Sequence, residues 1–295
     1  MVEIVADARR GRGRFSRRRF LQACSGMFLA GGGTVAYGST AGVSNLEVEH
    51  VTARIPTLAP RWHGRRIVLL SDLHHGRTDL GLIVHSLEMA AALKPDFLVI
   101  TGDFVDNKYA DVDSLVRALK PFTSSIETLG CTGNHDYGRN PDYARALCER
   151  LEGAGVRMLR NAFQMAWERS GPGELCFAGV DDLWNEEFDP RVLARVPADA
   201  AVVLLCHNPD CWDLVSGFHV DVMLSGHTHG GQVCVPFVGP LILPVENRSR
   251  YAGAYHPDME HPHRMLYITR GVGHLVKIRL FCPPEVTCIT LQGNA

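Results

Sequence analysis

Histidine, aspartate and asparagine residues recur at five places where a run of apolar residues ends. The five segments are Asp72-Leu73-His74, Gly102-Asp103, Gly133-Asn134-His135-Asp136, Cys206-His207-Asn208 and Gly226-His227-Thr228-His229-Gly230. Imidazole nitrogens with carboxylate and amide oxygens form a ligand set that suits Mn, Fe or Zn, and not Ca or Mg. Two divalent ions about 3.5–4 Å apart need this many ligands, together with one carboxylate that bridges them. The pattern therefore predicts a two-metal centre.

A single segment of this kind carries little weight. Asp-x-His occurs by chance, and a histidine after a strand is more often a hydrogen-bonded surface residue. Five such segments in order, each closing an apolar run, are not explained by coincidence. The chain also holds fourteen histidines against thirty lysines and arginines, and metal binding would account for most of that high count.

Apolar runs of strand length alternate with amphipathic segments of helical spacing, and the five segments follow the strands. This alternation predicts an α/β fold with a largely parallel or mixed sheet, in which ligands bind at the carboxyl ends of the strands. Strands are predicted at 46–55 (an edge strand), 66–72, 97–101, 128–132, 175–180, 201–206 and 220–224. Helices are predicted at 79–93, at 112–119 (where Pro121 would stop the helix) and at 143–152.

The overall composition is that of a globular protein of 295 residues with a sizeable core. A formal net charge of -2 creates no field that would recruit nucleic acid. The nine cysteines are dispersed without a CxxC pair, and several stand inside apolar runs. We expect them to be small buried hydrophobic residues rather than disulfide partners.

The N-terminus has the composition of an export signal. Seven arginines between Arg9 and Arg19 precede an apolar, glycine-rich stretch from Phe20 to Tyr37. Residues 16–22 (Ser-Arg-Arg-Arg-Phe-Leu-Gln) resemble the twin-arginine (Tat) consensus. A basic arm that binds nucleic acid or anionic lipid is the alternative, but the apolar run follows at once. We predict a twin-arginine signal or N-terminal anchor at 1–41.

The order of the motifs carries a resemblance to a known superfamily. D-x-H, G-D-x-x-D, G-N-H-D/E, a lone H and G-H-x-H all occur in this order between Ile67 and Gly230. The chain thereby resembles the calcineurin-like metallophosphoesterases. Gly271 and the segment 282–287 are similar to the ending of the bacterial exported or membrane-associated branch (YkuE/YaeI-like). The resemblance implies a metallophosphoesterase domain at 46–293, folded as a four-layer α/β/β/α sandwich with two mixed sheets.

The resemblance also implies a role for each motif residue. One metal would be bound by Asp72, His74 and His229, and the other by Asn134, His207 and His227, with Asp103 bridging both. His135 would be no ligand. It would face the substrate phosphate as general acid, oriented by Asp106.

The implied activity is a two-metal phosphoesterase, acting as phosphodiesterase or phosphatase. A hydroxide that bridges the metals would attack phosphorus, because water shared by two cations is acidified to a pKa of about 7. The cofactors are two divalent ions, Mn, Fe or Zn, with Mn preferred. The export signal favours an envelope or lipid-linked phosphoester, with the Tat machinery and a membrane surface as partners.

Two alternatives stay open from the sequence. One is hydrolysis of the diphosphate in UDP-2,3-diacylglucosamine, which belongs to nearby branches of the superfamily but conflicts with Tat export. The other is a non-catalytic metal-binding scaffold, although such proteins commonly lose ligands or the G-N-H histidine, and here none is missing.

Four further residues near the motifs have more than one possible role or position. Asp136 is expected to accept hydrogen bonds from loop backbone rather than to bind metal. His75 either lines the pocket or is an exposed loop residue, and Arg77 either contacts a phosphate oxygen or is solvated. Trp184 is expected in the core or at the rim.

Overall fold

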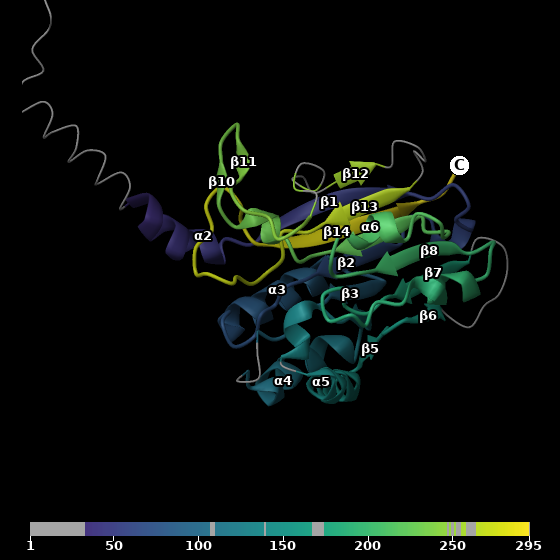
Figure 1. Ribbon diagram of the computed structural model, residues 1–295, viewed down its shortest axis with the longest axis horizontal. Helices are drawn as coiled ribbons and strands as arrows, with labels where there is room; N and C mark the ends of the chain where they lie inside the picture. Colours follow the sequence, from purple (N-terminus) through teal and green to yellow (C-terminus); the bar gives the residue numbers. More distant parts are fainter. Residues whose placement is uncertain are drawn as a thin grey trace, which may run out of the picture.

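Two six-stranded sheets pack face to face in the computed structural model of the chain (Figure 1). It describes residues 33–106, 110–138, 140–166, 174–246, 248, 251, 255–257 and 264–294. Most of the predicted N-terminal signal, including Cys24, lies outside these residues. The proposed boundary between signal and domain therefore stays a prediction.

The first sheet has the strand order β1-β14-β2-β3-β4-β5. All neighbours in it are parallel except β14 and β2, which are antiparallel. The first strand pairs only with the C-terminal strand, which confirms the predicted edge strand. The strands are β1 (Glu47–Arg54), β2 (Arg66–Leu70), β3 (Phe97–Thr101), β4 (Glu127–Cys131), β5 (Val156–Met158) and β14 (Glu285–Gln292).

The second sheet has the order β12-β13-β9-β8-β7-β6, with four parallel strands between two antiparallel edges. Both sheets are mixed, as the resemblance implied. Its strands are β6 (Ala162–Met165), β7 (Leu175–Gly179), β8 (Ala201–Leu205), β9 (Val222–Ser225), β12 (Tyr255–Pro257) and β13 (Met265–Ile268). A separate small hairpin joins β10 (Cys234–Val235) to β11 (Gly239–Pro240).

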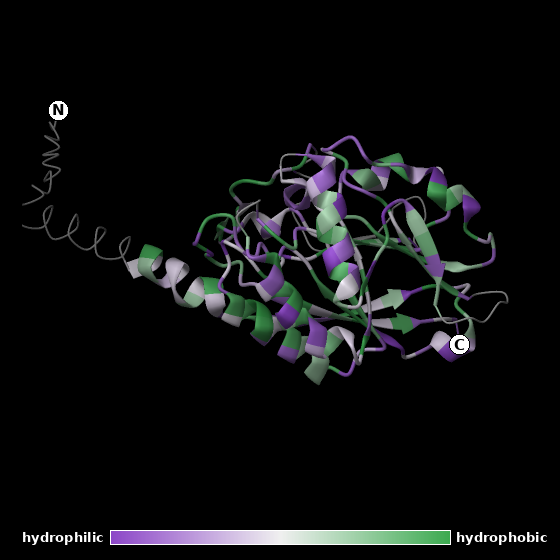
Figure 2. Cartoon of the chain, turned by 90° about the horizontal axis from the view of Figure 1, so that it is seen from below, coloured by the Kyte–Doolittle hydropathy of each residue, from purple (hydrophilic) through white to green (hydrophobic). Residues whose placement is uncertain are grey.

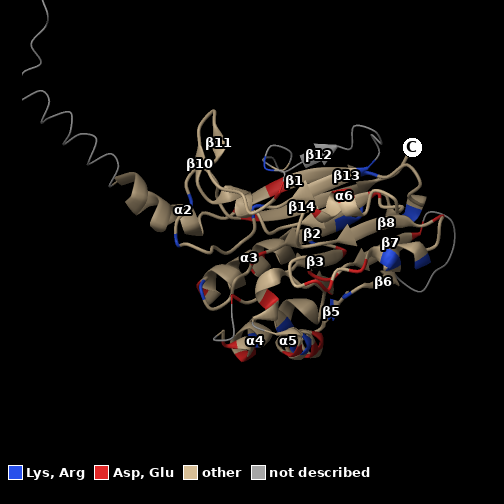
Figure 3. Ribbon diagram, viewed as in Figure 1, with Lys and Arg blue, Asp and Glu red and all other residues tan. Residues whose placement is uncertain are grey.

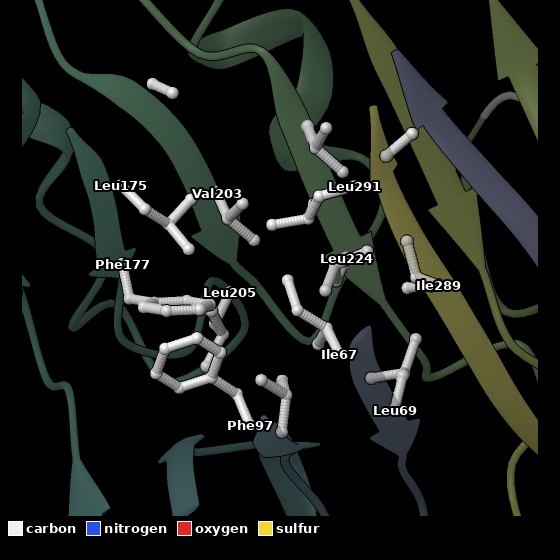
Figure 4. Packing of buried hydrophobic residues seen from close by; sticks show 14 of the residues in the cluster. Ile67, Leu69, Phe97, Leu175, Phe177, Val203, Leu205, Leu224, Ile289 and Leu291 are labelled. Atoms are coloured by element: carbon white, nitrogen blue, oxygen red, sulfur yellow. The ribbon is translucent and has the colours of Figure 1, made fainter. Parts of the chain in front are cut away.

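The central core lies between the two sheets, where side chains from both interdigitate (Figure 4). Ile67 and Leu69 of β2 face this core, while the alternate residues Val68 and Leu70 face the helices on the other side. A strand buried on both faces has no polar positions to alternate with, which explains its continuous apolar run.

Helices cover the outer faces of the two sheets and complete four layers. On the first sheet lie α3 (Leu80–Ala92), α4 (Val112–Thr123) and α5 (Pro141–Gly153). Each begins at a side-chain cap, supplied by Asp79, Asp111 and Asn140. The second sheet has a thinner cover, made by η3 (Pro190–Arg195) and α6 (Cys211–Leu214). The remaining short helices are α2 (Ala41–Ser44), η1 (Pro60–Trp62), η2 (Asn134–Tyr137) and η4 (His229–Gly231).

One predicted helix end was wrong. Pro121 was expected to stop the helix that begins at Val112, but α4 continues through it to Thr123. Proline deprives the last turn of one backbone donor. The turn persists because Phe122 packs against the core beneath the helices and Thr123 is buried.

The cysteines behave as predicted in the part of the chain that the structure describes. Eight are free thiols, of which seven are buried, and Cys234 is half-buried. No helix among the described residues is both long enough and apolar enough to span a bilayer.

We predict that the aromatic contact between the sheets is a main source of stability. Phe177 is fully buried with its ring centroid 4.8 Å from that of Phe97. Phe177→Ala should lower the free energy of unfolding by about 3–5 kcal/mol, because it leaves a cavity between the sheets. Urea titration followed by circular dichroism measures this loss.

The same substitution at Phe237, which is fully exposed, is the matched control. It should change the free energy of unfolding by no more than about 0.5 kcal/mol. Equal losses in the two variants would contradict the assignment of the core.

Candidate metal centre

The five motif segments meet where the carboxyl ends of strands from both sheets converge. Asp72, His74, Asp103 and Asn134 follow β2, β3 and β4 of the first sheet, whereas His207, His227 and His229 follow β8 and β9 of the second. The structure therefore brings together six of the seven residues that the sequence singled out as ligands, from segments as far apart as Asp72 and His229. Asn134 lies on the same edge, directly before His135, whose N–H donates to Asp103.

The first set consists of Asp72, His74 and His229, whose side chains are all buried. The Nε2 atoms of His74 and His229 lie 3.1 Å apart, and Oδ1 of Asp72 lies 3.4 Å from Nε2 of His229. Three ligand atoms that face one point in a buried space could hold one cation.

The second set is built around His207 and His227. Nε2 of His207 lies 3.2 Å from Nδ1 of His227. The other ring nitrogens lie 2.8 Å from the carbonyl of Thr101 and 2.9 Å from that of Pro244, respectively. Such contacts fix the tautomer and turn the free nitrogen toward a metal.

Asn134 supplies an independent test of whether a cation fits here. Its Oδ1 atom is buried and has no hydrogen-bond partner among the described residues. Leaving such an oxygen unsatisfied costs free energy. A neutral oxygen ligand suits a divalent transition metal that imidazoles also bind, so the residues fit a bound ion.

Asp103 stands between the two sets. Its Oδ2 atom lies 3.4 Å from Nε2 of His74 and 3.2 Å from Nε2 of His207. Its other oxygen accepts a hydrogen bond of 2.8 Å from the backbone N–H of His135. One carboxylate oxygen therefore faces both halves of the ligand set.

The backbone is strained at the ligand positions. Asp72, His74, Asp103, His227 and His229 all have a positive φ, between 43° and 67°. Residues other than glycine seldom adopt this conformation, and it concentrates at functional sites. Glycine is needed next to them as well, because a Cβ on Gly226 would collide with the side chains of Ser71 and Asp72.

Burial makes three imidazoles neutral, which is the form that binds metal. It lowers the pKa of His74 and of His227 to about 3, and it takes the pKa of His229 well below its ordinary value. Burial also raises the pKa of Asp72 to about 6, because a carboxylate loses its hydration there.

His207 and Asp103 behave as a pair. Burial opposes charge on both, yet Asp103 raises the pKa of His207 to about 10, and His207 in turn lowers the pKa of Asp103 below its usual range. Without metal, the proton on His207 thus supplies the positive charge that Asp103 requires. A bound cation would take over that task and release the proton.

His135 and Asp106 lie together at the edge of the centre. Nδ1 of His135 is 3.1 Å from the carbonyl of Asp106 and 3.3 Å from its Oδ1 atom. The His135 side chain is 27% exposed, whereas the sets of ligands are buried. A ring nitrogen of His135 also lies within 4.8 Å of ligand atoms of His74 and Asp103, so the ring stands between the ligands and solvent.

Arg77 makes protein contacts that were not expected for it. Its Nε atom lies 2.6 Å from Oδ2 of Asp106, and Nη1 donates to the carbonyl of Leu275 over 2.9 Å. Its side chain, although half exposed, is held by these contacts and anchors Asp106.

Two more local predictions can be compared with the structure. Asp136 accepts hydrogen bonds from the backbone of Val105 and Gly133, as expected, and burial raises its pKa to about 8. His75 is neither exposed nor in the pocket. It is buried, with Nε2 2.8 Å from Oγ of Ser114 at the start of α4.

Sequence reasoning missed residues that contact the ligands. Trp184, which is 53% exposed, sets its ring edge-on to His227 with centroids 4.4 Å apart. Its neighbour Asn185 lies near the carbonyl of Asn134, at 3.4 Å. The acidic loop after β7 was a signal that could have directed attention to both. The buried Arg279, which binds the carbonyls of Gly273 and His229, had no signal in the sequence.

Residues 65–231, more than half of the chain, match the family of calcineurin-like phosphoesterases. The chain belongs to this family. It is a metal-dependent phosphoesterase with a candidate buried His/Asp metal site.

Three relatives extend the similarity beyond the matched segment. Phosphodiesterase YaeI of Escherichia coli is 32% identical over 278 residues, covering 94% of this chain and 99% of that protein. The uncharacterised metallophosphoesterase YkuE of Bacillus subtilis is 30% identical, covering 95% and 99%. UDP-2,3-diacylglucosamine pyrophosphatase LpxG of Chlamydia trachomatis is 28% identical, covering 82% of this chain and 88% of LpxG.

We predict that His227→Ala removes one ion and leaves the other. Metal content per folded chain should fall from about two ions to about one, because Asp72, His74 and His229 remain in place. Elemental analysis of the purified protein measures this ratio. His219, exposed near the opposite end of β9, provides the matched variant His219→Ala, which should keep both ions. Full occupancy in His227→Ala would exclude His227 as a ligand.

Proposed function

We propose that the chain is a two-metal phosphodiesterase that acts on an envelope or lipid-linked phosphodiester. The observation that carries the two-metal part is the position of Asp103, whose single oxygen faces His74 at 3.4 Å and His207 at 3.2 Å. The similarity to a phosphodiesterase over nearly the full chain supports the choice of a diester.

Two divalent ions, when bound, supply positive charge to the phosphoryl oxygens and lower the pKa of water. Manganese is our choice for both, because the ligand set mixes imidazole with carboxylate and amide oxygen. The ligand residues hold their donors in place before substrate arrives, since their backbones are fixed at strand ends. Such preorganisation lowers the cost of binding the transition state.

The proton transfer is assigned to His135. In the hydrolysis, a P–O bond forms to the oxygen of water while the P–O bond to the leaving alcohol breaks. Asp106 holds Nδ1 of the ring, so that a proton on Nε2 can pass to the departing oxygen. General acid catalysis of this kind contributes about 10²–10⁴-fold.

The decisive variant is His135→Ala. Loaded with Mn, it should keep both metals but hydrolyse an aryl phosphodiester about 10²–10⁴-fold more slowly than wild type. Turnover of bis(p-nitrophenyl) phosphate and p-nitrophenyl phosphate is measured together with metal content. The preferred ester also tests the choice of a diester.

His63→Ala is the matched control, because His63 is exposed before β2, at the end of that strand away from the metal centre. It should retain full activity. A His135→Ala variant as active as this control would remove His135 from the mechanism, and a metal-loaded wild type inactive on both esters would contradict the proposed activity.

The diphosphate of UDP-2,3-diacylglucosamine is the second candidate substrate, favoured by the similarity to LpxG. Its hydrolysis breaks a P–O–P bond and needs the same metals and the same proton donor. If UMP were released from this substrate faster than any tested diester is cleaved, UDP-2,3-diacylglucosamine would be the preferred substrate class.

Export by the twin-arginine route is part of the proposal and has its own test. Replacing Arg17 and Arg18 together by lysine preserves charge but removes the arginine pair that defines the consensus. The full chain should then accumulate in the cytoplasm of an expressing cell, as fractionation and immunoblotting would show.

The control makes the same substitutions at Arg9 and Arg10, which lie outside the consensus, and should leave the distribution unchanged. Export of both variants to the same extent would contradict the twin-arginine assignment.

A further inference from the structure

Exposed apolar side chains gather at one end of the molecule. Eleven large hydrophobic residues are exposed among the described residues, and only Trp184 and Leu214 lie elsewhere. The other nine come from the N-terminal described segment, the β10–β11 hairpin region and the loop before β14. They are Val35, Tyr37, Val235, Phe237, Val238, Leu241, Ile242, Val276 and Phe281, and we call them the apolar end.

The exposure is high at the tip of the hairpin. Phe237 and Val238 stand in the turn between β10 and β11, and they are 110% and 74% exposed. Figure 1 shows this hairpin projecting from the body of the protein beside α2. Residues presented so far outward gain nothing from packing in the folded chain, and such patches mark binding surfaces.

Hydrogen bonds from the backbone and from the Gln232 side chain hold the three segments of the apolar end together. Gln232 donates from Nε2 to the carbonyls of Val276 and Ile278, at 2.7 and 2.9 Å. The N–H of Cys234 donates to the carbonyl of Leu280 over 2.9 Å. The N–H of Arg279 donates to the carbonyl of Gly38, also over 2.9 Å. The apolar side chains therefore stand on one fixed platform.

The segments that carry the apolar end have no acidic residue of their own, although Glu47 lines the same cavity as Tyr37 and Phe281. Residues 33–46, 230–245 and 271–284 contain no aspartate or glutamate. Lys277 is exposed among them, next to Val276. Figure 3 shows no acidic residue on α2 or on the β10–β11 hairpin, while α4 and α5 on another side of the molecule carry several.

The position of the N-terminal segment indicates what binds to the apolar end. The apolar, glycine-rich sequence of residues 20–37 ends at Tyr37, which itself belongs to the apolar end. Figure 2 shows hydrophobic residues along the described segment where the N-terminal part of the chain enters the molecule. A second copy of the chain would fit a flat face better than a projecting hairpin.

We propose that the apolar end is a membrane-docking surface, with the side chains of the β10–β11 hairpin, Val276 and Phe281 inserted into the interfacial region of a lipid bilayer. Apolar residues beside the cation Lys277, on segments that themselves carry no acidic residue, suit the headgroup and acyl boundary of an anionic membrane.

Docking in this way would bring the metal centre close to lipid. Gln232, where the platform begins, follows three residues after the candidate ligand His229, and Arg279 joins the two through the carbonyl of His229 at 3.4 Å. That consequence rests on the proposed function. The docking itself rests on exposure, composition and position, and it is tested without turnover.

The test introduces a fluorophore at the tip, using the full chain. Phe237→Trp is mixed with vesicles of phosphatidylethanolamine and phosphatidylglycerol whose acyl chains are brominated, and its emission is compared with that of wild type. The emission added by the new tryptophan should shift to shorter wavelength and drop by about half or more, because interfacial insertion places it among the brominated chains. Flotation of the vesicles shows in parallel how much protein is bound.

Leu214→Trp is the matched control, because Leu214 is 51% exposed on α6, outside the apolar end. Its added emission should not be quenched. Protein that floats with the vesicles but shows equal quenching in both variants would overturn the proposal, as would protein that does not float. The proposal would also be overturned if the protein formed a dimer in vesicle-free solution and Phe237→Ser converted that dimer to a monomer. The apolar end would then be the binding surface for a second copy of the chain.

A second measurement separates docking from catalysis. Phe237→Ser combined with Phe281→Ser should slow hydrolysis of a phosphodiester lipid embedded in vesicles about tenfold or more, while soluble bis(p-nitrophenyl) phosphate is cleaved as by wild type. Equal rates on both substrates would remove docking from the mechanism. Wild type that cleaves neither substrate would contradict the proposed function and leave the quenching result standing.

Discussion

Two buried carboxylates set the constraint on which the rest of the structure depends. Asp72 and Asp103 lie among imidazoles that burial holds neutral at His74, His227 and His229. Negative charge in such a place is costly unless positive charge is nearby. Divalent cations meet this need, and the protonated His207 meets part of it without them. The site is therefore organised for cations first, and its reactivity follows from them.

Holding the ligands in position costs backbone strain, and the two sheets supply the stability that offsets it. Five of the ligand residues have a positive φ, directly after strands whose side chains fill the central core. A single sheet could not provide the ligands, since β2 to β4 belong to one and β8 and β9 to the other. The site exists only where both sheets end together. Side chains also tie the two sheets near this edge, because Arg160 and Tyr137 both bind the carboxylate of Asp181 after β7.

The sequence predicts those elements of the fold that produce a local pattern of apolar and polar residues. The strand at Phe97–Thr101 was predicted with the bounds that the structure has, because burial on both faces leaves an unbroken apolar run. The candidate ligands were found because they directly follow such runs. The place of β14 between β1 and β2 could not be predicted, since it depends on pairing between the two ends of the chain. His75 was misjudged and Arg279 was missed because their roles depend on partners from distant segments.

Hydrogen bonds of Arg279 connect the metal centre to the apolar end. Its buried guanidinium donates to the carbonyls of Gly273, Arg270 and Cys282, and it lies near that of His229. Burial lowers its pKa, and nearby Cys282, Asp72 and Glu285 oppose that shift. The backbone N–H of the same residue binds Gly38 at the entry of the N-terminal segment. One residue thus fixes the loop that carries a candidate ligand, the loop that carries Val276 and Phe281, and the start of the described chain. Cys282, which directly follows Phe281, donates from Sγ to the same carbonyl of His229, so the two regions are joined at more than one point.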